Sequence, residues 1–347
     1  MAYPRFSYII RNFAPGWLAA VMGTGILAMV TENLSRRLPV LFGAAYLLHW
    51  LNTAIFMLLA PVWLGRWLRF RKIALSTLRH PVQADFYPTF SIGMLVLAAE
   101  WHVFSPASPQ IALIFWWPGA VITFVFSFAV LFHMLQGDHV LIDHITPAKF
   151  IPAVGLVVIP LAGAPLLREM SGVVRDWALF INTVGMGSGS MMYMGLLGLT
   201  LHRGYLHKPA NGTLLPTAWI HLAPIGVIPV GLLNLLTQMP YPVAREMVLI
   251  IMMLVWGFGV WWLIMAVLLT LAEVKKRRLP FALSWWGLIF PLGAFVAEGL
   301  QLNQETGSSG FLAISVTAWL LLLILWLITA IKTGHGVWTG RIFLPDK

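Results

Sequence analysis

The sequence is poor in charged residues and has no cysteine. Asp, Glu, Lys and Arg make up 10% of the 347 residues, whereas hydrophobic residues make up 59%. A soluble domain usually carries about 25% charged residues, so this chain has too little polar surface to fold with water as its main solvent. The absence of cysteine excludes disulfides, thiolate metal sites and cysteine nucleophiles. This composition indicates a protein that folds in the lipid bilayer.

Three further features are missing. No Walker-type phosphate loop occurs, so the chain gives no support for ATP-driven activity. The N-terminal stretch lacks the pattern of a signal peptide because Arg11 and Pro15 interrupt its apolar core, so we expect the first span to remain in the mature protein. The net charge of +10 comes from residues in short loops rather than from one clustered basic face, so we expect no nucleic-acid partner.

Long apolar stretches fill most of the chain. A helix needs about 20 apolar residues to cross a bilayer. No long polar stretch separates the apolar segments, so residues 1–347 are expected to form one transmembrane domain. The sequence predicts ten spans, at residues 13–31, 39–65, 86–104, 110–135, 148–167, 173–201, 214–237, 243–272, 281–302 and 311–331.

The basic residues predict the orientation of these spans. Loops rich in Lys and Arg remain in the cytoplasm. If the N-terminus is cytoplasmic, most of the 22 Lys and Arg residues fall on the inner side, and the C-terminus is cytoplasmic as well. We therefore expect a multi-pass protein of the cell (inner or plasma) membrane. Only five basic residues fall on the outer side: Arg36, Arg37, Arg168, Arg175 and Arg245.

Prolines recur in the odd-numbered spans at intervals of 64 to 73 residues, a length that accommodates two spans and their loops. The repeating unit is therefore a helical hairpin, and hairpins of the same sense are parallel repeats about an axis along the membrane normal. Proline lacks an N–H and frees a carbonyl four residues back, which must find a partner or face water. The alternative explanation for the recurring prolines is that prolines are common in membrane helices in general. The prolines expected to kink pore-lining helices are Pro15, Pro88, Pro152, Pro224 and Pro291.

Five stretches resemble one known family. They are residues 13–25 (FAPGWLAAVMGTG), 78–90 (LRHPVQADFYPTF), 146–163 (TPAKFIPAVGLVVIPLAG), 220–227 (IHLAPIGV) and 285–293 (WWGLIFPLG). In this order they resemble the tellurite-resistance/dicarboxylate transporter family, which includes TehA-type and plant slow anion channels. The resemblance implies an all-α membrane protein with ten transmembrane helices, as five hairpins in quasi-five-fold arrangement around a central pore. It also implies a homotrimer in which each subunit has its own pore.

The resemblance also implies a pore gate. Family members close the pore with a phenylalanine of the ninth helix that precedes Pro or Gly, and Phe290, followed by Pro291, occupies that position here. A bulky ring at a helix kink can close a narrow apolar pore by steric blockage and by dewetting. The alternative is a core aromatic residue between helices.

Three titratable residues within the spans are possible substrate-contacting or proton-binding groups: Glu298, His221 and Glu100. An intramembrane carboxylate is by default a functional hypothesis. Glu298 lies eight residues after Phe290, about 80° away around an ideal helix. Both carboxylates are near the predicted outer ends of their spans, where they could reach water. The alternative for Glu298 and Glu100 is a structural role as a hydrogen-bonded carboxyl near the membrane interface. The alternative for His221 is a histidine packed in the core.

A polar loop offers the only sign of an enzyme. The segment HMLQGDHVLIDH contains Asp138, His139, Asp143 and His144. A metalloenzyme needs three converging ligands and an open position, and this spacing does not put the two histidines on one helix face. We therefore expect a solvated loop, with no metal, no cofactor and no enzymatic activity.

Two functional hypotheses remain open. The first is passive transport of small anions through a pore gated by Phe290. The second is a proton-linked transporter of C4-dicarboxylates such as malate, or of sulfite, on the same fold. They differ in whether transport requires a titrating group.

Overall fold

The computed structural model describes residues 4–137, 140–207, 212–239, 244–276 and 279–343. Within these ranges the chain forms helices and helical turns and no strand, which confirms the predicted all-helical class. The long helices are α2 (Ala19–Ser35), α3 (Phe42–Arg69), α5 (Thr89–Phe104), α6 (Pro109–Leu135), α7 (Phe150–Leu166), α8 (Gly172–Leu206), α9 (Leu222–Leu236), α10 (Arg245–Lys275), α11 (Trp286–Thr306) and α12 (Ser309–Trp338).

Shorter elements lead into several of these helices. The two short α-helices are α1 (Phe6–Arg11) and α4 (Arg71–Leu78). The 3₁₀ turns that matter for the site are η1 (Pro15–Leu18), η3 (Gln83–Phe86), η4 (Ile142–His144), η5 (Pro147–Lys149), η7 (Gly212–His221) and η8 (Leu283–Trp285).

The described helices meet the requirements of a multi-pass membrane protein. Eight are long and apolar enough to cross a bilayer, and the pair formed by α4 and the η3–α5 segment, bent by 109°, would make a ninth. The predicted span at residues 173–201 corresponds to α8, which has 35 residues and is long enough. Its middle, residues 185–190 (GMGSGS), consists mostly of Gly and Ser, so α8 is less apolar than the other spans.

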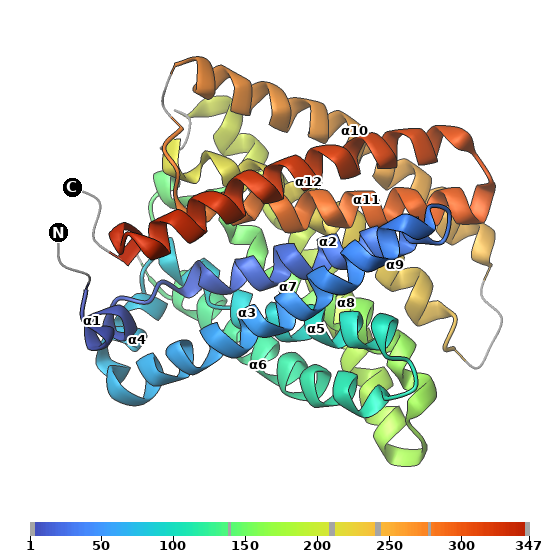
Figure 1. Cartoon of the computed structure of the whole chain (residues 1–347), viewed down its shortest axis with the longest axis horizontal. Coiled ribbons are helices and arrows are strands. Elements are labelled where there is room, and N and C mark those ends of the chain that lie inside the picture. The colour runs from blue at the N-terminus through green and yellow to red at the C-terminus, as the bar shows by residue number, and fades with distance from the viewer. Residues whose placement is uncertain (1–3, 138–139, 208–211, 240–243, 277–278, 344–347) are drawn as a thin grey trace.

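The long helices run side by side along the bundle (Figure 1), and their contacts divide them into an inner and an outer set. α2 contacts α5 and α11, α7 contacts α5 and α9, and α9 contacts α11, so these five inner helices form a closed circuit. Each packs against the helix that follows it in the chain, and we call α3, α6, α8, α10 and α12 the outer helices. Between 72% and 89% of the residues in the apolar windows of the segments containing α2, α7, α9 and α11 are buried, against 22% to 44% for α3, α6, α10 and α12.

Close backbone contact holds the inner helices together. A Cβ atom on Gly226 of α9 would lie 2.3 Å from the backbone of Ala294 on α11, so only glycine permits this approach. Without a hydrophobic driving force between helices in lipid, such close packing is a main source of stability.

Polar contacts fasten three inner helices at their N-terminal ends. The Nζ atom of Lys149, in η5 before α7, lies 3.0 Å from the Asp85 carboxylate in η3 before α5, and it also donates to the carbonyl of Pro81. The hydroxyl of Thr89 at the start of α5 donates to the Pro15 carbonyl at 2.8 Å. These bonds fix the ends of α2, α5 and α7 relative to one another.

The prolines singled out in the sequence lie mostly at helix starts. Pro15 opens η1 and Pro88 immediately precedes α5. Pro152 and Pro224 lie in the first turns of α7 and α9, where a backbone N–H has no intrahelical acceptor, so they break no hydrogen bond. Of the five, Pro291 alone is interior to its α-helix. The interior prolines of α7 and α9 are instead Pro160, Pro165 and Pro229.

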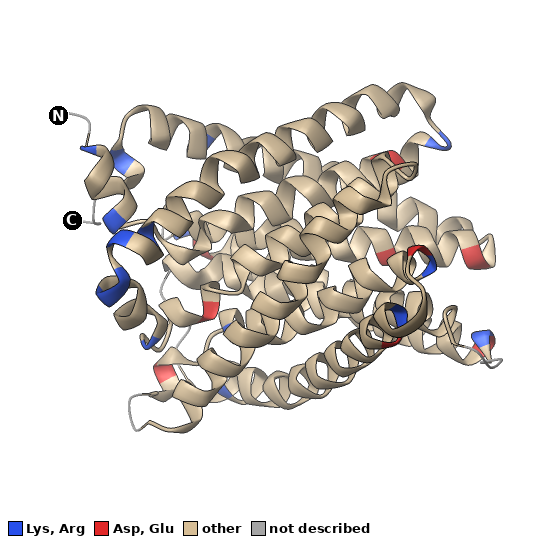
Figure 2. Ribbon diagram, turned by 90° about the horizontal axis from the view of Figure 1, so that it is seen from below, with Lys and Arg blue, Asp and Glu red and all other residues tan. Residues whose placement is uncertain are grey.

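The two ends of the bundle differ in charge. Lys and Arg gather at the end that carries both termini (Figure 2). At the opposite end Arg37 donates to Asn303, Arg175 to the Gln238 carbonyl and Arg245 to Glu305. Four basic residues that the sequence places with the termini, Lys208, Arg277, Arg278 and Lys347, lie outside the described residues.

The contact at Gly226 yields a stability prediction. We expect Gly226→Ala to lower the free energy of unfolding by about 1–3 kcal/mol, because the added methyl forces α9 away from α11. The control is Gly257→Ala on α10, where a Cβ meets no atom within 4 Å and the higher helix propensity of Ala adds up to about 1 kcal/mol. Thermal unfolding in detergent measures both, and equal effects would contradict the backbone contact.

Candidate functional site

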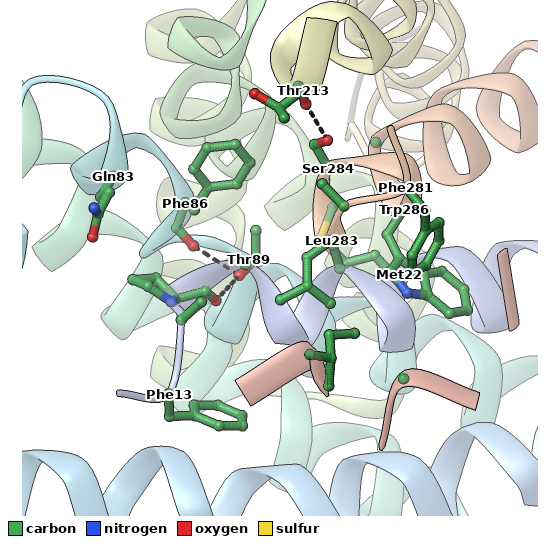
Figure 3. Close-up of a pocket in the computed structure, with 18 of the residues that line it drawn as sticks. Phe13, Met22, Gln83, Phe86, Thr89, Thr213, Phe281, Leu283, Ser284 and Trp286 are labelled. Atoms are coloured by element: carbon green, nitrogen blue, oxygen red, sulfur yellow. Dashed lines mark hydrogen bonds between the residues drawn. The ribbon is translucent and has the colours of Figure 1, made fainter. Parts of the chain in front are cut away.

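A cavity of about 1060 Å³ opens among the N-terminal ends of the inner helices (Figure 3). Every inner helix contributes to its wall. Because the wall draws on all members of the closed circuit, the cavity lies on the axis that they surround. The side chains contributed in chain order include Met22, Thr89, Val154, Ala223 and Phe290.

The walls are held by hydrogen bonds between elements distant in the sequence. Ser284 in η8 donates to the Thr213 carbonyl in η7, and the single hydroxyl hydrogen of Thr89 is shared between the Phe86 carbonyl at 2.7 Å and the Pro15 carbonyl (Figure 3). These bonds join η8 to η7 and α5 to η1, so they fix segments of the wall relative to one another.

The charged residues of the cavity wall all have the same sign. They are Arg11, Arg66, Lys332 and Arg341, and the described lining contains no Asp or Glu. Arg11, Lys332 and Arg341 are exposed, whereas Arg66 is buried. A concave wall with charges of one sign and low-dielectric surroundings focuses the electrostatic field. We call this space the basic cavity, and its field attracts anions.

The deep end of the basic cavity, formed by the lining residues furthest along the inner helices, is mostly apolar and buried. Phe290 is 2% exposed, and Met22, Val154 and Ala223 are also buried. Seven residues further along each helix, close to two turns, Met29, Leu161, Val230 and Ala297 are again partly exposed. On four of the five inner helices, a buried residue of the cavity lining is therefore followed, two turns further on, by a partly exposed residue of the same face.

The predicted pore prolines contribute unequally. Pro15 and Pro291 line the basic cavity, and Pro291 adjoins Phe290. Pro88, Pro152 and Pro224 are buried but do not belong to the described lining.

Glu298 is fully buried and does not line the basic cavity. Neither of its carboxyl oxygens has a hydrogen-bond partner among the described residues. The expectation that this side chain reaches water near the outer end is wrong, because α11 is an inner helix and is covered by α2, α9, α10 and α12.

Glu100 is also fully buried, so the same expectation is wrong for it. Its carboxylate accepts a hydrogen bond from Asn52 at 2.7 Å and lies 3.3 Å from the Nδ1 atom of His49. Both partners come from α3, which covers this part of α5. The spacing of His49 and Asn52, three residues apart on one helix face, was the available signal for this cluster.

His221 lies in the core at the end of η7. Its ring lies 4.4 Å from the ring of Phe150 and 4.0 Å from that of Trp262, measured between centroids. It is 1% exposed and does not belong to the described lining of the basic cavity. These contacts are those of a packed core histidine.

The structure adds little to the metal hypothesis. Asp138 and His139 lie outside the described residues, while Asp143 and His144 form part of η4. Within the ranges that the structure describes, no three His, Asp or Glu side chains converge as a metal site would require.

The sequence analysis named none of the basic residues of the wall as a site residue, because the sequence does not show which of the many Lys and Arg near the span ends line a cavity. With them in place, fold and site define a class: a polytopic helical membrane protein with a closed circuit of inner helices and a basic cavity on its axis.

Comparison with known proteins identifies the family. The chain belongs to the voltage-dependent anion channel family, whose sequence profile matches residues 12–334. This confirms the resemblance found in the sequence and makes the chain a membrane transport protein of an anion-transporting family, rather than a member of an enzyme family. A transporter of Methanocaldococcus jannaschii is 40% identical, over 96% of this chain and 96% of the relative.

Fungal relatives of the chain include transporters of named anions. The sulfite efflux pump of Arthroderma otae is 25% identical over 96% of this chain and 93% of its own length. The malic acid transport protein of Schizosaccharomyces pombe is 20% identical over 97% of this chain and 81% of its own length.

The two buried carboxyls yield opposite stability predictions. We expect Glu298→Met to raise the free energy of unfolding by about 1 kcal/mol, because it removes a buried polar group that has no partner among the described residues. Glu100→Met should lower it by roughly 1–3 kcal/mol, because it leaves Asn52 and His49 without their acceptor. Thermal unfolding of the purified variants measures both changes, and a loss of stability in Glu298→Met would show that its carboxyl is partnered.

Proposed function

We propose that this protein conducts small anions passively through a central pore that Phe290 closes. The observation that carries this proposal is the basic cavity: all five inner helices line it, its described charges are all positive, and Phe290 is buried at its deep end. Positive wall charges favour anions, and an apolar constriction blocks their passage by dewetting.

We further propose that α8 is a tenth span, so that five hairpins surround the pore. The closed circuit of inner helices and the pairing of each with the next helix in the chain support this arrangement. The partly exposed Met29, Leu161, Val230 and Ala297 would then line an outer vestibule beyond Phe290. The family resemblance implies a homotrimer. We therefore propose that three copies of the chain assemble and that each subunit has its own pore.

The permeant ions that we propose are small inorganic anions, sulfite among them, or C4-dicarboxylates such as malate. The names of the two fungal relatives support both kinds of oxyanion. Each ion would gather in the basic cavity and cross when Phe290 moves aside.

A proton-linked carrier is the second candidate function. Glu298 and the Glu100–His49 pair favour it, because they place titratable groups in the bilayer-spanning part of the bundle. A carrier of this kind would require a pH gradient for uptake, whereas a pore conducts down the electrochemical gradient without one.

The proposed location is the cell membrane with both termini in the cytoplasm, supported by the Lys and Arg at the end that carries the termini. Because the natural chain has no cysteine, single cysteines can report the two sides. In right-side-out vesicles we expect an impermeant thiol reagent to label Ser308→Cys directly and Ser7→Cys only after permeabilisation. Ser7 and Ser308 are both exposed, so the reagent can reach either cysteine. Direct labelling of Ser7→Cys, with Ser308→Cys labelled only after permeabilisation, would contradict the proposed orientation.

The gate has a direct test. We expect Phe290→Ala to raise anion flux several-fold in proteoliposomes, because it removes the ring that closes the cavity. The matched control is Phe295→Ala on the same helix, where the ring stacks on Trp256 at 5.2 Å and does not line the cavity.

Phe295→Ala should lower stability by roughly 3–5 kcal/mol and leave the flux per folded molecule unchanged. Unchanged flux in folded Phe290→Ala protein, or an equal rise in both variants, would contradict a gate at Phe290.

A further inference from the structure

Arg66 is a buried cation without a counter-charge. It lies in the last turn of α3, is 5% exposed and lines the basic cavity. In the part of the chain that the structure describes, no carboxylate oxygen lies within 4.0 Å of its guanidinium. Its hydrogen-bond partners are the hydroxyls of Tyr87 at 3.2 Å and Thr77 at 2.7 Å, which are neutral.

Lys149 shows that the fold does neutralise a buried cation nearby. This lysine is 7% exposed and lies 3.0 Å from the carboxylate of Asp85. A buried charge without a partner is strongly unfavourable, and the usual solution is an ion pair of this kind. The difference between Lys149 and Arg66 indicates that the counter-charge of Arg66 comes from an ion in the cavity.

The guanidinium is held in a fixed orientation. The Tyr87 hydroxyl donates to the Ala74 carbonyl at 2.6 Å, and the Thr77 hydroxyl donates to the Ile73 carbonyl at 2.8 Å. Each hydroxyl has committed its own hydrogen, so each can only accept from Arg66. A guanidinium has five N–H groups in a planar fork, so three remain after these two bonds, including that of the unpartnered Nε.

We propose that Arg66 is an anion-binding residue of the basic cavity and that its ligand is a small oxyanion, a carboxylate or a sulfur oxyanion. The proposal rests on the proposed anion transport and names the ions that this cavity selects. A guanidinium fork forms parallel hydrogen bonds with two oxygens of one anion, which a spherical halide cannot match. Arg11, Lys332 and Arg341 are exposed, so salt screens their attraction and they distinguish anions poorly.

Oxyanion binding to purified full-length protein tests the assignment. Thermal unfolding is followed in detergent at constant ionic strength during titration with sodium malate, sodium sulfite or sodium chloride. A ligand that binds only the folded state stabilises it by RT ln(1 + L/Kd), where L is the free ligand concentration, so the unfolding temperature rises with ligand concentration and rises more for a tighter ligand. We expect malate, sulfite or both to stabilise the wild type more than chloride does.

Three variants distinguish binding of an oxyanion at Arg66 from the general electrostatic attraction of the cavity wall. Arg69→Gln is the matched control, because Arg69 lies in the same last turn of α3 but is exposed and does not line the cavity. Arg69→Gln should keep the oxyanion response. Arg66→Gln should abolish it, and Arg66→Lys should raise the apparent Kd at least about tenfold, because the charge stays while the fork is lost.

The outcomes are distinct. An oxyanion response in Arg66→Gln equal to that of Arg69→Gln overturns the assignment, as does a wild type that responds equally to chloride and to both oxyanions. Arg66→Lys retains the buried charge, so it decides the question if Arg66→Gln does not fold. Anion flux in proteoliposomes is measured in parallel. A wild type that binds malate or sulfite but conducts no anion would contradict the proposed function, while the assignment of Arg66 as a binding residue would still hold.

Discussion

The bilayer core offers no hydrogen-bond partner and no counter-ion, and the rest of this structure depends on that constraint. Polar groups in the bundle are stable when they are satisfied inside it or border a space that ions and water can reach, and Glu298, which has no partner among the described residues, is an exception. Lys149 meets Asp85, Glu100 meets Asn52, and Thr89 meets the carbonyl of Pro15. Among the described residues Arg66 finds two hydroxyls and no carboxylate, so its charge is left for the cavity that it lines.

The wall charges and Phe290 belong to different parts of the basic cavity. The basic residues lie near the end of the bundle that carries the termini, while Phe290 lies among buried apolar side chains of several inner helices. An anion would be attracted and partly desolvated before it meets the constriction. In this account selectivity comes from the wall charges, with Arg66 favouring oxyanions, and control of flux comes from the ring of Phe290.

The helical class and the family could be predicted from the sequence, because long apolar segments and five ordered motifs are local features. Phe290 could also be singled out, since the motif around Pro291 is contiguous. The role of Arg66 could not, because it depends on how the end of α3 meets Thr77 and Tyr87 from the following segments. The burial of Glu100 and Glu298 was missed for a related reason: distance from a span end says nothing about which helices cover that end.

Passive conduction is the central claim, and charge movement without a pH gradient tests it most directly. Protein reconstituted in liposomes is given an inward sulfite gradient at equal pH on both sides, and the resulting membrane potential is recorded. The account predicts a potential of the sign set by anion entry, larger when Phe290 is replaced by alanine. No potential at equal pH, together with sulfite uptake once a pH gradient is imposed, would contradict the pore and establish a proton-linked carrier.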